Sequence, residues 1–326
     1  MPEQSPDAGR DLVTALERGD GGGEFHDAPV DASTLMFAAV EAGPEAGYAK
    51  KKGIGIAGWL CVAWLGLLAV LAIAGWLTDQ SIPGFPDPTK DVGGFKLDLF
   101  SPGHILGTDS SGRDTLSLVV NGTSASMFIG VFSVVIGFAF GGLFGILSGY
   151  FKGRVGAVLG STTDILLAFP PLVLAISIVT FMGNTVWWVT LALAIVSIPV
   201  TARIARAATL SWAEREFVTA ARAQGAKHGR VMLRELVPNV LPAMVSIALL
   251  GIAVVIVAEA SLAIVGAGVS SDTITWGSII NGGRQDLDNA PFIVVIPSVV
   301  IFLTVMALNF LGDVMRAKFD VRESAL

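Results

Sequence analysis

The segment FVTAARAQGAKHGRVMLRELVPN, residues 217–239, is charged and alanine-rich, and it lies between two long apolar runs. Its charged side chains flank Gly225 on both sides. A short polar insert of this kind does not belong in a bilayer, whereas the runs on either side of it are long enough to cross one. The segment therefore predicts a water-exposed connection within a membrane protein.

The composition of the whole chain agrees with this prediction. Of 326 residues, 53% are apolar and 15% are charged, with a mean hydropathy of +0.70, whereas soluble domains carry roughly 25% charged residues. A helix needs about 20 apolar residues to span a bilayer. Six runs qualify, which predicts an all-α, polytopic membrane protein; the expected spans are 54–77, 125–150, 159–182, 186–205, 239–265 and 291–312. Pro170 and Pro171 lie inside the third run, where they predict a kinked helix.

The basic residues predict which loops lie inside. With the N-terminus in the cytoplasm, 17 of the 21 Lys and Arg residues fall on the cytoplasmic side, as the positive-inside rule requires. Six spans then return the C-terminus to the cytoplasm as well. We expect a largely disordered cytoplasmic tail over 1–53 and a transmembrane domain over 54–326, with an outer loop at 78–124 and a cytoplasmic loop at 206–238.

Motifs for chemistry within the chain are scarce. GIGIAG (53–58) matches a dinucleotide fingerprint, but it opens an apolar span rather than following a strand. No P-loop motif occurs, so an energy source would have to come from a partner or an ion gradient. Cys61 is the single cysteine, and the three histidines are far apart, which disfavours a metal site or a catalytic triad. An intramembrane enzyme is therefore not favoured.

Acidic residues within the spans are functional candidates by default. Asp164 and Glu259 both fall near span ends rather than at mid-membrane, which disfavours an ion-coupled carrier. We interpret them, with Pro170 and Asn309, as candidates for helix packing or gating.

The segment at 217–239 predicts two short helices. EREFVTAARAQ is rich in helix-forming residues, Gly225 suits a chain reversal, and Pro238 opens the next span. The small side chains of Thr219, Ala220 and Ala221 beside Arg222 favour close docking by another protein. The alternative is a helix that lies on anionic lipid through its basic side chains.

The same segment resembles the cytoplasmic loop of binding-protein-dependent ABC transporter permeases, in which an alanine pair precedes a glycine and a proline follows at this spacing. Further stretches are similar to the dipeptide/oligopeptide/nickel subfamily, and to its second type of permease subunit; they are GHILGTDSSGRDTLS (103–117), SGYFKGRVGAVLGSTTDILLAFPPLVLA (148–175), residues 258–284 and LTVMALNFLGDVMRAKFDVR (303–322). Three positions differ from the usual pattern, namely Thr219, Glu235 and Val237.

The resemblance implies a type I importer permease fold in the cell membrane, with 217–224 as a coupling helix that docks on an ATPase subunit. The implied docking residues are Phe217, Thr219, Ala220, Ala221, Arg222, Gly225 and Pro238. In the outer loop, the resemblance points to Asp109, Arg113 and Asp114.

The implied partners are a second homologous permease, two ATPase subunits or domains, an extracellular binding protein and membrane lipid, with no nucleic acid. ATP and Mg would be bound by the ATPases, and no cofactor is expected in this chain.

The cargo that the resemblance implies is a di- or oligopeptide. Nickel chelates and sugars remain alternatives within the same transporter class. A purely structural membrane subunit is a further alternative, against which the docking segment argues.

Overall fold

The structure is a computed structural model that describes residues 55–88, 90, 94–96, 98–151 and 153–323. The chain divides into two units, Met1–Gly53 and Ile54–Leu326. The expected tail at 1–53 lies outside the described residues, and everything below concerns the second unit.

The described residues form helices and contain no strand, only two isolated bridges in the loop before the second long helix. The all-α fold predicted from the sequence is confirmed. In chain order the helices are α3 (Ile56–Leu77), α4 (Thr115–Tyr150), α5 (Arg154–Leu167), α6 (Pro171–Met182), α7 (Val186–Ala213), α8 (Glu216–Ala223), α9 (His228–Val231), η1 (Met232–Leu236), α10 (Val237–Ile264), α11 (Trp276–Gly283), η2 (Arg284–Asp286) and α12 (Phe292–Glu323).

Five helices of the described chain are long and apolar enough to cross a membrane: α3, α4, α7, the continuous run from α9 through α10, and α12. The expected span at 159–182 is a broken one, which makes a sixth span if the two bent helices are taken together. The chain there forms two helices, α5 and α6, bent by 87° at a break that contains Pro170. Pro170 and Pro171 lack backbone N–H groups, so helical hydrogen bonding cannot run through them and the axis changes direction.

The helix bounds also differ from those expected at α4. This helix begins at Thr115 instead of 125, so the preceding loop ends at Asp114. Its first turns are rich in polar residues, which the sequence alone places in a loop. Ser117, Asn121 and Ser124 are nevertheless buried, and their side chains are hydrogen-bonded. Burial against other segments therefore extends the helix beyond its apolar part.

The helices α4 and α7 make the closest packing in the bundle. Gly137, Gly141 and Gly149 recur at multiples of four residues and face α7. A Cβ atom on Gly141 would lie 2.6 Å from the carbonyl oxygen of Ile198, so the two backbones are in direct contact. Small residues at this spacing allow membrane helices to approach closely.

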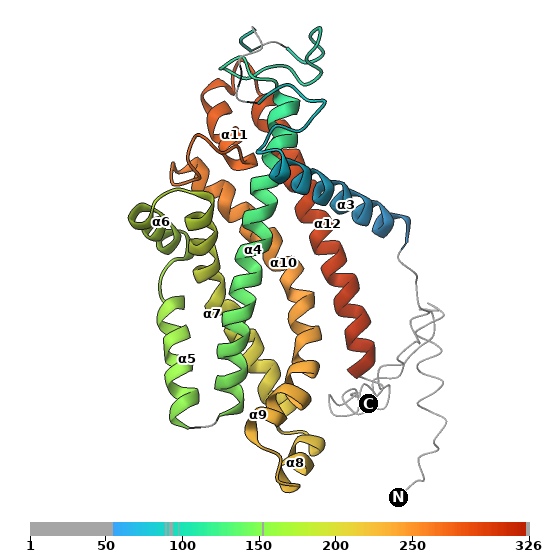
Figure 1. Cartoon of the computed structure of the whole chain (residues 1–326), viewed down its shortest axis with the longest axis vertical. Coiled ribbons are helices and arrows are strands. Elements are labelled where there is room, and N and C mark those ends of the chain that lie inside the picture. Colours follow the sequence, from blue (N-terminus) through green and yellow to red (C-terminus); the bar gives the residue numbers. More distant parts are fainter. Residues whose placement is uncertain (1–54, 89, 91–93, 97, 152, 324–326) are drawn as a thin grey trace, which may run out of the picture. The chain divides into compact units, whose positions relative to one another are not determined.

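Two apolar clusters fill the remainder of the bundle. One joins α3, α4, α10, α11 and α12 around the fully buried Trp276. The other joins α4, α6, α7 and α10 around Ile129 and Leu262. Figure 1 shows α8 and α9 at one end of these long helices, and α11 with the loop before α4 at the other. The two predicted polar regions thus lie at opposite ends of the bundle.

Candidate functional site

The short helix predicted in the opening segment is present as α8, at the end of α7. Val218 anchors it, because this side chain is fully buried in a cluster with Tyr150, Val231 and Leu236. These residues come from α4, α9 and η1, so the helix is held by three separate elements. Burial of one valine fixes which face of α8 remains free.

Gly225 ends α8 in a left-handed turn with φ of 82°. The N–H of Gly225 donates to the carbonyl of Arg222 at 2.9 Å, and the N–H of Ala226 donates to that of Ala221 at 3.1 Å. This pair of bonds is the Schellman pattern, which favours glycine at the position that Gly225 occupies. The chain reversal predicted at Gly225 is confirmed.

Tyr150 is the structural centre of this end of the bundle, and sequence reasoning missed it. Its hydroxyl lies 2.8 Å from Nδ1 of His228, at the start of α9. The guanidinium of Arg222 lies 4.8 Å from the centre of its ring, in a cation–π contact. Tyr150 therefore ties α4 to both α8 and α9. Its position within GYF, at the end of an apolar run, gave no signal of this role.

The predicted docking residues do not all share one environment. Thr219, Ala220, Arg222 and Gly225 are exposed, and the side chain of Phe217 is 38% exposed and lies beside Trp212. Ala221 is instead partly buried against the Val218 cluster, so it faces the bundle. An arginine at that position would disturb folding as well as docking, which makes Ala220 the better position for testing the surface.

The second predicted short helix is not separate from the following span. The helix α9 continues through η1, a π-helical turn, directly into α10. Pro238 lies in the first turn of α10, where its missing N–H removes an α-helical donor. The Asn239 side chain donates to the carbonyl of Glu235 at 2.6 Å. The π turn thus joins the α8 region to α10 without a break in the chain direction.

A hollow of about 340 Å³ opens beside the turn that ends α8. It is lined by Ala221, Gln224, Gly225, Ala226, Arg230, Val231, Arg234 and Glu235. The two arginines give its wall a positive charge, next to the exposed small side chains of α8. This end of the bundle therefore combines a small-residue helix with a basic recess.

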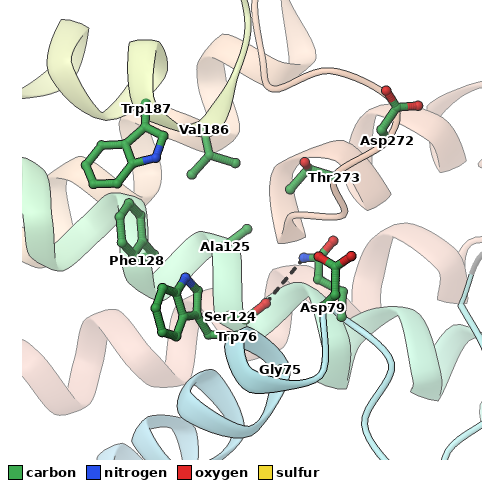
Figure 2. A pocket seen from close by; sticks show the side chains of 11 residues that line it. Gly75, Trp76, Asp79, Ser124, Ala125, Phe128, Val186, Trp187, Asp272 and Thr273 are labelled. Atoms are coloured by element: carbon green, nitrogen blue, oxygen red, sulfur yellow. Dashed lines mark hydrogen bonds between the residues drawn. The ribbon is translucent and has the colours of Figure 1, made fainter.

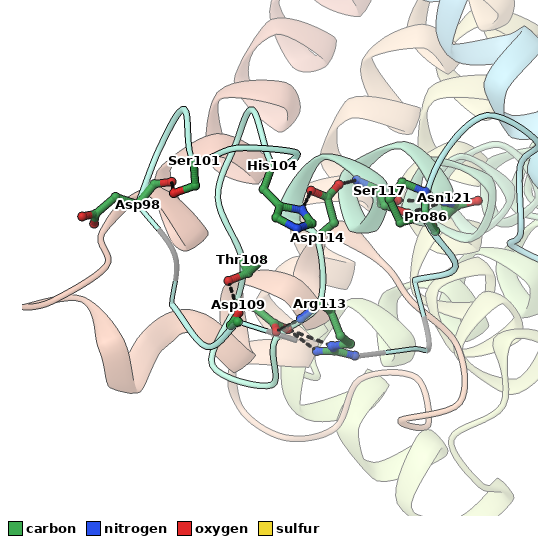
Figure 3. A network of polar contacts seen from close by, with 11 residues as sticks. Pro86, Asp98, Ser101, His104, Thr108, Asp109, Arg113, Asp114, Ser117 and Asn121 are labelled. Atoms are coloured by element: carbon green, nitrogen blue, oxygen red, sulfur yellow. Dashed lines mark hydrogen bonds and ion pairs between the residues drawn. The ribbon is translucent and has the colours of Figure 1, made fainter. Parts of the chain in front are cut away.

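At the opposite end, the loop before α4 is organised by Asp109 (Figure 3). Its carboxylate accepts hydrogen bonds from the backbone N–H groups of Ser111 and Arg113, both at 2.8 Å. It also pairs with the Arg113 guanidinium, at 2.7 Å to Nη2 and 2.8 Å to Nε. Asp109 and Arg113, which the sequence singled out, thus close a tight turn within the loop.

Asp114, the third predicted residue of this loop, caps α4. One carboxylate oxygen accepts from the N–H of Ser117 at 2.8 Å, and the other lies 2.9 Å from Nδ1 of His104 (Figure 3). An aspartate at this position satisfies a free N–H at the start of a helix. Asp114 is 4% exposed, so its contacts are internal to the loop. The loop is also joined to η2 by an ion pair between Lys96 and Asp286.

Glu259 lies near the end of α10 and is fully buried. Its carboxylate accepts a hydrogen bond from the Thr275 hydroxyl at 2.7 Å. Thr275 in turn caps α11 together with Ser278. Glu259 therefore links α10 to α11.

The remaining candidates lie in different places. Asp164 on α5 contacts Arg203 on α7 at 3.4 Å, and both side chains are mostly exposed. Pro170 stands at the bend between α5 and α6. Asn309 is partly buried on α12, and its side-chain amide has no hydrogen-bond partner among the described residues. The structure does not bring these three together with Glu259 into one site.

The fold and the two ends define a class of protein: a helical membrane protein with a short, exposed helix held between two spans. The model of one family, the binding-protein-dependent transport system inner membrane component, matches residues 141–324. The chain belongs to this family, and it is a membrane permease subunit of an ABC importer. The resemblance seen in the sequence is confirmed.

Curated relatives cover most of the chain. It is 35% identical over 262 residues to the glutathione transport system permease protein GsiD of Pectobacterium atrosepticum, covering 79% of this chain and 85% of the relative. It is 32% identical over 271 residues to the dipeptide transport system permease protein DppC of Alkalihalophilus pseudofirmus, covering 83% and 86%. The GsiD of Escherichia coli O157:H7 is 37% identical over 255 residues, covering 78% and 82%.

Among solved structures, the chain is similar to the inward-facing MetNI methionine ABC transporter. The TM-score is 0.53 at 22% identity, covering 61% of this chain and 95% of that one. At this identity the likeness concerns the fold, which is that of an ABC importer permease. The type I importer fold expected from the sequence is confirmed.

Proposed function

We propose that this chain is one of two homologous permeases in an ATP-driven importer of di- or oligopeptides. The relatives named above are permeases of glutathione and dipeptide transport systems, which supports a peptide cargo. An extracellular binding protein would deliver the peptide, and two ATPase subunits would bind ATP and Mg and supply the energy. The chain itself would hold no cofactor.

The observation that carries the proposal is the construction of α8. The helix is anchored by Val218 and ended by the Gly225 turn, and its free face carries Thr219, Ala220 and Ala223. Small side chains allow a partner's surface to approach the helix backbone closely. A helix that is held on one side and clamped by an ATPase on the other would pass movement into α7 and α10.

The charges support a cytoplasmic position for the α8 end. This end carries Arg215, Arg222, Lys227, Arg230 and Arg234, and basic residues concentrate in cytoplasmic loops. The α11 end carries Asp109, Asp272, Asp286 and Asp288 and would face outward. Both chain ends would then lie in the cytoplasm of a cell with the protein in its plasma membrane.

The test has a binding step and a transport step. We expect the tagged chain, captured in mild detergent from cells that express the whole transport system, to bring down an ATPase and a second permease. Vesicles containing this complex should take up a labelled dipeptide only with ATP and binding protein. Capture of the chain with neither subunit, or uptake driven by an ion gradient without ATP, would overturn the proposal.

The docking surface is tested by a matched pair at Ala220. Ala220→Arg places a long cation on the exposed face and should abolish ATPase capture, while the permease stays folded. Ala220→Ser keeps a small side chain and should retain capture. Uptake of a nickel chelate or a sugar in place of the dipeptide would reassign the cargo without changing the transporter class.

A further inference from the structure

A cavity of about 370 Å³ opens at the α11 end of the bundle. Four segments distant in sequence meet there: the end of α3 with the residues after it, the first half of α4, the start of α7 and the loop between α10 and α11. The side chains relevant here are Trp76, Asp79, Phe128, Trp187, Asp272 and Thr273. None of them was singled out from the sequence.

The lining is divided by chemistry (Figure 2). Trp76, Phe128 and Trp187 gather on one side, and Asp79, Asp272 and Thr273 on the other. Phe128 and Trp187 meet edge to face, with 5.2 Å between ring centres. The cavity therefore offers aromatic surface and negative charge to the same occupant.

The acidic side is held in place by Gln80. Its side-chain amide pairs with the backbone of Ile274: Nε2 donates to the carbonyl at 2.8 Å, and Oε1 accepts from the N–H at 2.9 Å. Asp79 and Gln80 both adopt positive φ, 50° and 59°, which is uncommon for residues other than glycine. The two hydrogen bonds of the Gln80 side chain join the segment that carries Asp79 to the loop that carries Asp272. They offset the conformational free energy that the two positive φ angles cost.

The two carboxylates are not neutralised by any cation in the described part of the chain. Neither Asp79 nor Asp272 forms an ion pair with any described residue, and both are exposed to the cavity mouth. Two other acids at this end are neutralised within the chain, since Asp109 pairs with Arg113 and Asp286 with Lys96. Two unpaired carboxylates facing aromatic rings form a suitable environment for a cation bearing an apolar group.

We propose that this cavity binds a protonated amine attached to an apolar group, as at the amino terminus of a peptide with a bulky first residue. The carboxylates contact the ammonium group, and Trp76, Phe128 and Trp187 pack against the side chain. This inference rests on the proposed function for its identification of the amine with the cargo. The cavity then selects for a free amino terminus at the point where a peptide enters the permease.

The experiment uses the full chain with its co-purified subunits, without binding protein, in nanodiscs of zwitterionic lipid. Titration calorimetry at pH 6.5 compares the dipeptide Phe-Ala with N-acetyl-Phe-Ala, which lacks the positive charge. We expect the free dipeptide to bind about tenfold more tightly or better, in line with the strength of cation–π and carboxylate contacts at partly exposed sites. Phenethylammonium, which has no peptide bond, should compete for the same site.

Variants locate the site. Asp79→Asn and Asp272→Asn should each remove most of the preference for the free amine, and Trp187→Leu should weaken binding of the free dipeptide. Asp288→Asn makes the same charge change at an exposed position outside the cavity and should bind as the parent does. Gel filtration of each complex checks that the variants are folded.

Three results would overturn the inference. They are equal affinity for the free and acetylated dipeptides, no binding of Phe-Ala or phenethylammonium, and a preference for the free dipeptide that survives in both aspartate variants. These outcomes are separable from failure of the proposed function. ATP-driven uptake of both dipeptides with no preference would leave the importer intact and remove the amine site. Amine binding without ATP-driven uptake would keep the site and remove the assignment of its ligand as cargo.

Discussion

The hydroxyl of Tyr150 lies 2.8 Å from Nδ1 of His228, and this contact joins the last residue of α4 to the first residue of α9. The two residues are 78 positions apart in sequence. Because Tyr150 also lies under the Arg222 guanidinium, one side chain connects the elements on both sides of the Gly225 turn.

Removal of the Tyr150 hydroxyl should loosen this connection. We expect Tyr150→Phe to cost about 1 kcal/mol locally, the usual net value of one hydrogen bond, and to speed hydrogen exchange across residues 216–231. A double-mutant cycle with His228→Ala should show coupling. Thr162→Ala, which removes a hydroxyl bonded only within α5, is the control and should add independently to Tyr150→Phe. Strict additivity between Tyr150 and His228 would contradict the contact.

Gly225→Val should disrupt the turn that ends α8. A side chain at φ of 82° costs roughly 1–2 kcal/mol, and a β-branched residue is especially poor there. We expect dipeptide uptake to fall while basal ATP hydrolysis continues, as measured in proteoliposomes. Gly229→Ala, in α9 at ordinary φ with open space around it, should have little effect. Normal uptake by Gly225→Val would argue against a coupling role for this turn.

Two adjacent glycines of α4 should respond differently to the same change. A methyl group on Gly141 would lie 2.6 Å from the Ile198 carbonyl, so Gly141→Ala should force the α4 and α7 backbones apart and cost about 1–3 kcal/mol. A methyl group on Gly142 would meet only the flexible end of Met244. Gly142→Ala should therefore be tolerated. Thermal unfolding in detergent compares the two, and equal midpoints would contradict the direct backbone contact.

Glu259 should matter for the joint between α10 and α11 through its hydrogen bond. Glu259→Ala leaves the Thr275 hydroxyl without its acceptor in a buried place and creates a cavity, at a cost of about 3 kcal/mol. Glu259→Gln retains an oxygen that can accept from Thr275 and should be much milder. Thermal unfolding measures both variants. A Gln variant as unstable as the Ala variant would show that the negative charge, rather than the hydrogen bond, is required.

The sequence predicts best what depends on local pattern. The apolar runs identify the spans, and the alanine-rich segment with Gly225 predicts both α8 and its turn. These features follow from composition and from the backbone freedom of glycine, so they need no tertiary contact. The resemblance to a family adds the ATPase subunit that we propose as the partner of α8.

Features that depend on distant contacts are not predictable in this way. The prolines at 170 and 171 indicate a kink, but the sequence does not give its size, which is 87° between α5 and α6. The first ten residues of α4 read as loop, because the burial of Ser117 and Asn121 depends on other segments. The contacts of Tyr150 and the lining of the amine cavity both involve residues far apart in sequence. No spacing pattern in the sequence therefore predicts them.

The glycines of α4 have a mechanical consequence. No flexible side chains lie between the α4 and α7 backbones where they touch, so we expect the two helices to move together as one rigid unit. The interruptions in regular helix geometry lie outside this α4–α7 unit. They are the break between α5 and α6 and the π turn between α9 and α10. We therefore expect a force applied at α8 to tilt α4 and α7 together, so that their opposite ends, which carry Phe128 and Trp187, move as well.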